Sequence, residues 1–186
     1  MIYSLKLETA LILIGLLLIA SHALALLQPR AVIAWLRALP RSRPLGFVLL
    51  SIAAIWFFWL TRTMDLGEFS NWRGTVLIAT PIVWFLTWRF VDEFLAARAL
   101  GMLVLLGAEP LLEAAFLRPE TSRLFLVTLV YVWVAFALFW VGMPFTLRDQ
   151  INWLTTGEKR WRCAAFAGLA YGTLLLVLPF TYAKPA

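Results

Sequence analysis

Residues 91–117, VDEFLAARALGMLVLLGAEPLLEAAFL, decide the fold because they form a long apolar run that still carries ionisable side chains. Read as a helix from residue 93 to residue 117, the run is about 37 Å long at 1.5 Å per residue, which is enough to cross a bilayer. At about 100° per residue, Arg98, Glu109 and Glu113 fall within an arc of about 60°. The run therefore predicts a membrane-spanning helix with one polar face.

The composition of the whole chain points to the same class of protein. Of the 186 residues, 63% are hydrophobic and 14% are charged, and ten Trp and fourteen Phe would leave a soluble domain of this size without a polar surface. We expect an all-α polytopic membrane protein that forms a single integral membrane domain, residues 1–186. The net charge of +6 comes from Lys and Arg in short segments between apolar runs, which indicates orientation in a membrane rather than binding to nucleic acid. Cys163 is the only cysteine, so an intrachain disulfide and a cysteine-rich metal site are excluded.

Six apolar runs and two shorter amphipathic segments make up the expected architecture. The apolar runs predict transmembrane helices, and the amphipathic segments, which mix basic and apolar residues, predict helices that lie at the membrane surface. The expected spans are residues 9–27, 45–62, 75–90, 93–117, 122–143 and 161–180, and the expected interfacial helices are residues 29–39 and 145–156.

The number of crossings depends on the run 75–90, which is short and contains Pro81, so five crossings are an alternative to six. Basic residues prefer the cytoplasmic side, and five crossings divide them almost evenly between the two sides. Six crossings with both termini outside leave six of them outside and place nine inside, with Arg98 not counted. The inner nine are Arg30, Arg37, Arg41, Arg43, Arg89, Arg148, Lys159, Arg160 and Arg162. We therefore predict six transmembrane helices with an N-out/C-out topology.

Glu109 is the position on the fourth span that most needs an explanation, because an ionisable group deep in a membrane is expensive. Arg98 and Glu113 lie near opposite ends of the helix, where long side chains can reach the surface, whereas Glu109 lies about 12 Å from the outer end. Pro110 cannot donate to the Leu106 carbonyl, and a protonated Glu109 could donate to it instead. The hypothesis is that Glu109 faces the protein interior, either as a proton-accepting site or as a polar contact that fixes helix packing.

His22 is the only histidine and the only candidate cofactor ligand. A neutral imidazole can be an axial ligand of haem iron or chlorophyll magnesium, although a hydrogen bond to a neighbouring helix is the alternative. Ser21 is expected to point about 100° away from it along the helix surface, so the two do not form a catalytic pair. HExxH spacing, Gly-rich phosphate loops and dinucleotide fingerprints are absent, and no enzymatic activity is predicted.

Ala164, Gly168 and Gly172 follow one another at four-residue spacing in the last span and let another helix approach closely, either within the chain or in a dimer. The loops are too short to hold a soluble domain. We therefore expect a helix-packing subunit or scaffold of a larger membrane complex, whose partners are the bilayer and other membrane subunits or a second copy, and short loops with a basic bias suit a bacterial inner membrane. The alternatives are a small transporter or proton-conducting protein that uses Glu109, and a haem or chlorophyll subunit that uses His22.

Overall fold

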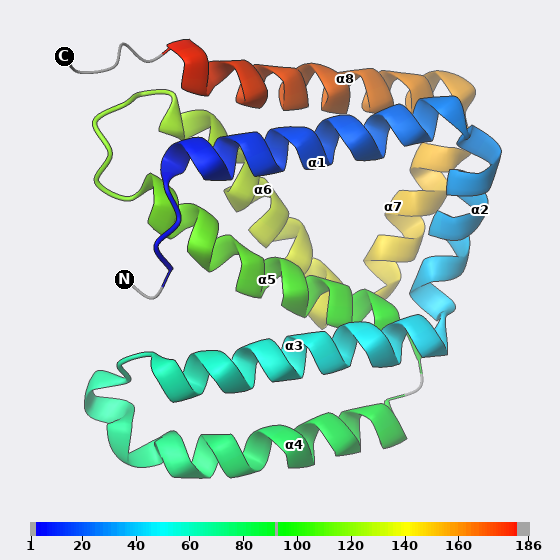
Figure 1. Ribbon diagram of the computed structural model, residues 1–186. Helices are drawn as coiled ribbons and strands as arrows, with labels where there is room; N and C mark the ends of the chain where they lie inside the picture. Colours follow the sequence, from blue (N-terminus) through cyan, green and yellow to red (C-terminus); the bar gives the residue numbers. More distant parts are fainter. Residues whose placement is uncertain (1–2, 92, 182–186) are drawn as a thin grey trace.

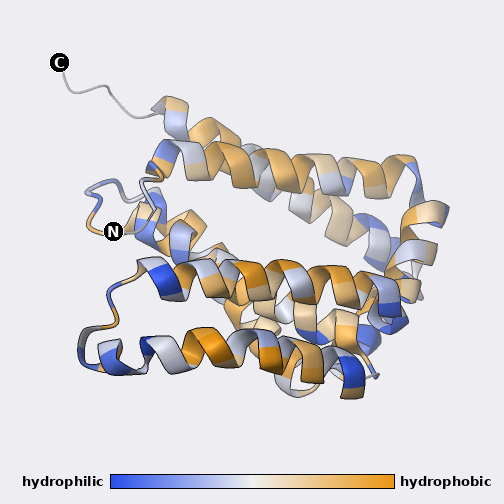
Figure 2. Ribbon diagram, turned by 60° about the horizontal axis from the view of Figure 1, so that its bottom comes forward, coloured by the Kyte–Doolittle hydropathy of each residue, from blue (hydrophilic) through white to orange (hydrophobic). Residues whose placement is uncertain are grey.

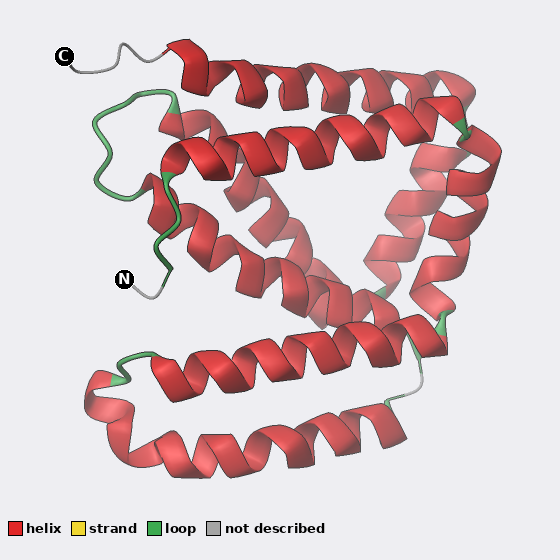
Figure 3. Ribbon diagram, viewed as in Figure 1, coloured by secondary structure: helices red, strands yellow, loops and turns green. Residues whose placement is uncertain are grey.

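The computed structural model describes residues 3–91 and 93–181, and within these ranges the only regular structure is helical (Figures 1 and 3). Long helices run back and forth, and two short ones lie across one end. The long helices are α1 (Leu7–Leu27), α3 (Arg43–Thr63), α4 (Arg73–Phe90), α5 (Leu95–Ala115), α6 (Arg123–Gly142) and α8 (Glu158–Val177). The short helices are α2 (Pro29–Ala38) and α7 (Phe145–Thr155), and the 3-10 turns are η1 (Leu39–Arg41), η2 (Gly67–Trp72) and η3 (Leu178–Thr181).

Five of the helices are long and apolar enough to cross a membrane: α1, α3, α5, α6 and the continuous segment Glu158–Thr181 that joins α8 to η3. This confirms an all-helical, multi-pass protein suited to a membrane. The helix α4 is not among the five, although it covers the predicted third span. Arg73 and Arg89 lie at its two ends, and polar threonines interrupt its apolar sequence, so its composition is less apolar than that of the others.

Most helix boundaries differ from the prediction by one to three residues, and two of these differences have local reasons. The helix α5 begins at Leu95 rather than at residue 93, because Phe94 adopts a left-handed conformation with φ 55°, which an α-helix cannot continue. Glu93 therefore precedes the helix, and Asp92 lies outside the described residues. The helix α8 begins at Glu158 rather than at residue 161, and its first turn is supported by an ion pair of 2.7 Å between Glu158 and Arg162.

The long helices form three layers (Figure 1). The pair α1 and α8 forms one side, α5 and α6 form the middle, and α3 with α4 forms the other side. The largest apolar cluster joins α1, α5, α6 and α8 around Leu11, Leu126, Val130 and Leu175, all of which are fully buried. A second cluster of Leu39, Ala97, Leu147 and Ile151 holds η1 and α7 against the start of α5.

Glycines set the closest helix contacts in the middle of the molecule. A methyl group on Gly46 would lie 2.8 Å from the Ala96 backbone nitrogen, and one on Gly101 would lie 2.9 Å from the Ala137 carbonyl oxygen. Both distances are shorter than a carbon atom tolerates, so only glycine lets α3 and α6 approach α5 this closely. This is how helices pack where lipid provides no hydrophobic driving force.

The charged residues are divided unequally between the two ends of the helix bundle, and the middle is apolar (Figure 2). The end that carries α2 and α7 is here named the basic end, because the described chain places ten basic and three acidic side chains there. The other end, where the described chain begins at Tyr3 and finishes at Thr181, is named the terminal end. It has five basic and five acidic side chains among the described residues, and Glu109 lies further into the bundle.

Candidate functional site

Arg98 lies in the first turn of α5, at the basic end, and binds the end of α6. Its Nη1 donates to the Val141 carbonyl oxygen at 3.3 Å, while its buried Nε has no hydrogen-bond partner among the described residues. The helix α6 ends at Gly142, so the Val141 carbonyl is one of the last four that lack a partner within the helix. A cation at this position is favourable for the helix dipole. Arg98 therefore caps α6 and joins it to α5.

Glu113 lies in the last turn of α5, at the terminal end, and belongs to a polar cluster with the beginning of the chain. Its Oε2 accepts a hydrogen bond of 3.2 Å from the Tyr3 backbone N–H. The Tyr3 hydroxyl accepts one of 2.7 Å from Trp56 Nε1, and the Tyr3 ring lies 5.8 Å from that of Trp59. Residues 3–6 thus connect the end of α5 to α3. Nothing in the sequence singles out Tyr3, because a tyrosine before an apolar run is common at a membrane surface.

Glu109 is partly buried and lies one turn before Glu113 and one turn after Leu105, on the same face of α5. No hydrogen bond or ion pair joins its carboxylate to a described residue. Pro110 follows it inside the helix, which leaves the Leu106 carbonyl without its usual donor. Arg98 is about 16 Å away along the helix axis at 1.5 Å per residue. The three residues on the polar face of α5 therefore act in separate places rather than as one site.

An apolar groove opens on the side of α5 that Leu105 occupies. It has a volume of about 430 Å³ and lies between α3, α4 and α5. Small side chains such as Ala53, Ala54 and Ala79 provide part of its wall, and larger ones such as Phe57 and Trp84 border it. The complete lining is Leu50, Ala53, Ala54, Phe57, Val76, Ala79, Thr80, Val83, Trp84, Thr87, Met102, Leu105 and Leu106.

His22 packs against α8 and binds a carbonyl of its own helix. Its Nδ1 lies 2.8 Å from the Leu18 carbonyl oxygen, which can only accept, so Nδ1 is the donor of this hydrogen bond. The ring lies so close to Gly168 that a methyl group there would be 2.2 Å from both Cδ2 and Nε2. The nitrogen that could bind iron or magnesium is thus packed beside α8, and His22 borders none of the cavities described for this structure.

Helical spacing predicts that Ser21 points away from His22, but in the structure the two side chains are in contact. Its Oγ lies 3.2 Å from His22 Nδ1, because both side chains turn back to the same Leu18 carbonyl, to which Ser21 Oγ donates at 3.1 Å. This contact does not make Ser21 a nucleophile activated by His22 as its base. The proton of Nδ1 is directed at the Leu18 carbonyl, so this nitrogen cannot accept the hydroxyl proton of Ser21.

The small-residue stripe of α8 faces α1 in this chain. A methyl group on Gly172 would lie 2.9 Å from Leu18 Cβ and 3.0 Å from the Gly15 carbonyl oxygen. Gly15 completes the contact from α1, where a methyl group would lie 2.9 Å from the Gly172 carbonyl oxygen. Ala164, one turn before Gly168, is partly buried. Gly15 is not identified from the sequence, since it has no small neighbour at four-residue spacing.

The described residues contain no group of three or more His, Cys, Asp or Glu side chains that could hold a metal ion. No protein-family model, curated protein or solved structure matches this chain.

Proposed function

We propose that this chain is a six-span integral membrane protein, with its N-terminus and C-terminus on the outer side, that serves as a helix-packing subunit of a larger membrane complex. A bacterial inner membrane is the proposed location, because the basic end then faces the cytoplasm. The same topology makes α2 and α7 interfacial helices on the cytoplasmic surface. The observation that carries the subunit role is the apolar groove beside α4.

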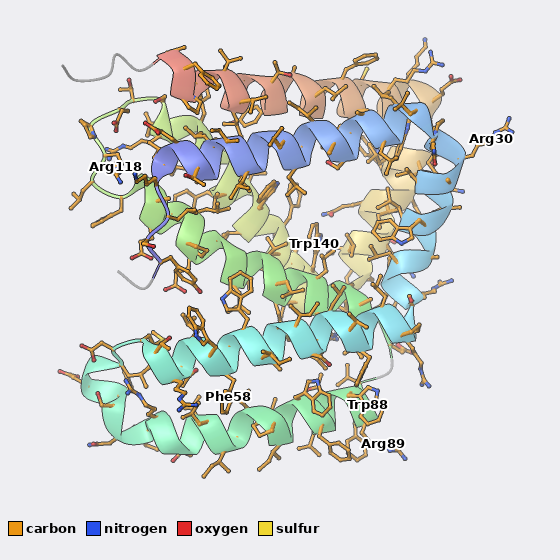
Figure 4. All side chains as sticks on the ribbon, in the orientation of Figure 1. Arg30, Phe58, Trp88, Arg89, Arg118 and Trp140 are labelled. Atoms are coloured by element: carbon orange, nitrogen blue, oxygen red, sulfur yellow. The ribbon has the colours of Figure 1, made fainter. Side chains whose placement is uncertain are left out.

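The length of α4 and the distribution of its polar residues support a sixth span. Its 18 residues extend about 27 Å at 1.5 Å per residue, close to the thickness of the hydrocarbon core. It runs beside α3 with an apolar middle and hydrophilic ends (Figure 2). Trp88 and Arg89 lie at its basic end (Figure 4), where Trp and Arg side chains meet lipid headgroups. Trp84 fastens it to α3 by donating from Nε1 to Ser51 Oγ at 3.1 Å.

The charge division between the two ends supports the orientation. The described chain has ten basic and three acidic side chains at the basic end, and five of each at the terminal end. This division fits the preference of Lys and Arg for the cytoplasmic side. The arginines of α2 and η1 and the basic residues at the start of α8 all lie at this end (Figure 1). Six crossings return both ends of the described chain to the opposite side.

The groove supports the subunit role because α4 is bound to the rest of the chain on one side only. No residue of α4 is buried, and large side chains including Ile78, Ile82 and Val83 are more than half exposed. The groove between α4 and α5 offers small residues at its wall, which is the feature that lets transmembrane helices approach each other. An apolar helix of a second, different membrane protein would contact α3, α4 and α5 together in this groove.

Site-specific photo-crosslinking in native membranes tests this role. A photoreactive residue at Ala79, in the groove wall, is compared with one at Phe166, which is 60% exposed on α8 away from the groove. We expect the Ala79 probe to form a discrete adduct with another membrane protein, identified by mass spectrometry, and the Phe166 probe to react with lipid only. An Ala79 probe that reacts with lipid alone, in a preparation that is homogeneous and free of partners, would contradict the subunit role, and an adduct with a second copy would replace it by a homo-oligomer.

A second candidate function is proton handling at Glu109, favoured by its partly buried carboxylate that has no partner among the described residues. The test is proton flux in liposomes reconstituted with the purified protein. Glu109→Gln keeps the size and removes the ionisable group, and Glu68→Gln in the exposed turn η2 is the matched control. Flux that is lost only with Glu109→Gln supports this function, and flux that is equal in both variants rules it out.

A further inference from the structure

A cavity of about 440 Å³ lies at the basic end, where the turn from α1 to α2 meets the turn from α7 to α8. Trp161 holds the beginning of α8 against the end of α1, since it is only 7% exposed and its Nε1 donates to the Ala25 carbonyl oxygen at 3.1 Å. Arg37 ties α2 to α7 by two hydrogen bonds to Thr155, of 2.9 Å to Oγ1 and 3.2 Å to the carbonyl oxygen. The cavity is therefore built by residues about 130 apart in the chain and held in shape by three hydrogen bonds.

The lining of this cavity is amphipathic. Leu26, Ile33 and Trp161 supply apolar surface, and Arg30 and Arg162 supply positive charge. Arg162 Nη2 is paired with Glu158 Oε1 at 2.7 Å, and this carboxylate also belongs to the lining, so the cavity retains one net positive charge.

Arg30 is placed to meet a charged group at the membrane surface. It follows Pro29 at the start of α2, is exposed, and extends outward from the corner between α1 and α2 (Figure 4). The helices α2 and α8 both begin at this cavity and have no side-chain cap, so the positive ends of their dipoles add to the potential of the two arginines.

We propose that this cavity binds the phosphate group of an anionic phospholipid, with Arg30 and Arg162 at the phosphate and the first part of an acyl chain against Leu26 and Ile33. The ligand chemistry follows from charge complementarity, because guanidinium groups bind phosphate oxygens with charge-assisted hydrogen bonds. A lipid rather than a soluble phosphate is favoured because apolar residues form part of the same cavity and the basic end lies at headgroup level in the proposed topology. The inference depends on that topology and not on the subunit role, so a failed crosslink at Ala79 leaves it intact.

The test is native mass spectrometry of the purified full chain titrated with phosphatidylglycerol and, separately, with phosphatidylcholine. We expect the wild type to prefer phosphatidylglycerol, and Arg30→Gln and Arg162→Gln each to weaken its binding about fivefold without changing the binding of phosphatidylcholine. Arg41→Gln is the matched control, since Arg41 is an exposed arginine of the same end that does not border the cavity. Both cavity arginines are exposed, so their loss should leave the elution of the protein from size exclusion unchanged.

Three results would overturn the proposal. Equal binding of the two lipids by the wild type would show that the cavity does not recognise anionic headgroups. If Arg41→Gln weakens phosphatidylglycerol binding as much as Arg30→Gln and Arg162→Gln do, the lipid is attracted by the charge of the whole basic end and not bound at this cavity. Inorganic phosphate that displaces phosphatidylglycerol at concentrations comparable to the lipid would show that the occupant is a soluble phosphate and that the apolar wall contributes nothing.

Discussion

The contact between His22 and Gly168 makes a quantitative prediction about the packing of α1 on α8. In the Gly168→Ala variant, the new methyl group would lie 2.2 Å from Cδ2 and Nε2 and 2.5 Å from Cγ of the imidazole, more than 1 Å closer than van der Waals contact. Either the ring rotates and gives up its 2.8 Å hydrogen bond to the Leu18 carbonyl, or the helices separate. Overpacking of this kind costs about 1–3 kcal/mol, and the better helix propensity of alanine returns up to about 1 kcal/mol. We expect a net loss of about 1–2 kcal/mol in the free energy of unfolding.

A double-mutant cycle isolates the cause of that loss. In a His22→Ala background the clash is absent, so Gly168→Ala should be neutral or stabilising by up to about 1 kcal/mol. The coupling between the two positions is then about 2 kcal/mol, measured by unfolding in mixed micelles with increasing SDS. Gly74→Ala is the control, because Gly74 lies in α4 with no atom near the added methyl group. Equal effects of Gly168→Ala in both backgrounds would refute the packing of the ring on Gly168.

Three further variants test contacts between helices by the same unfolding measurement. Arg98→Met should lower the free energy of unfolding by about 1 kcal/mol, because the Val141 carbonyl at the end of α6 loses its cationic donor. An unchanged free energy of unfolding would show that Arg98 does not stabilise the end of α6. Trp161→Phe should cost about 1 kcal/mol through the lost donor to the Ala25 carbonyl, and a loss several times larger would point to packing instead. Gly15→Ala should cost about 1–3 kcal/mol, since the methyl group meets the backbone of α8, which cannot rotate away as a side chain can, and wild-type stability would contradict that close approach.

The helices could be predicted from the sequence because the signals that define them are local. Every predicted span and both predicted surface segments are helical in the structure, and α2 and α7 each end within one residue of the prediction. Prolines and glycines mark these ends in the sequence itself. The start of α5 is not encoded in a local pattern, because the left-handed conformation of Phe94 depends on how the chain turns from α4 into α5.

Helix pairing could not be predicted, because residues that face lipid and residues that face another helix are equally apolar. The stripe in α8 indicates close packing but does not name α1 as its partner, and isolated glycines such as Gly46 and Gly101 give no periodic signal. The same limit applies to the polar residues. Spacing places Arg98 and Glu113 near opposite ends of α5, yet their partners, the Val141 carbonyl and the Tyr3 backbone, come from elsewhere in the chain.

The orientation of Ser21 shows a different limit. Helical geometry gives the direction in which a side chain leaves the backbone, and a short polar side chain then turns to the nearest acceptor. Ser21 and His22 leave the helix about 100° apart but share the Leu18 carbonyl, one turn earlier. Side-chain hydrogen bonds to the helix backbone therefore bring together groups that spacing alone separates.

The claim on which both the subunit role and the lipid site depend is that α4 crosses the membrane and the basic end faces the cytoplasm. Single-cysteine accessibility measures this directly, in a Cys163→Ser background that removes the one native cysteine. Glu68→Cys reports the turn between α3 and α4, and Glu93→Cys reports the connection between α4 and α5, both at exposed positions. We predict that a membrane-impermeant maleimide labels the Glu68→Cys variant in intact cells and the Glu93→Cys variant only after permeabilisation. Labelling of both variants from the same side would contradict the account.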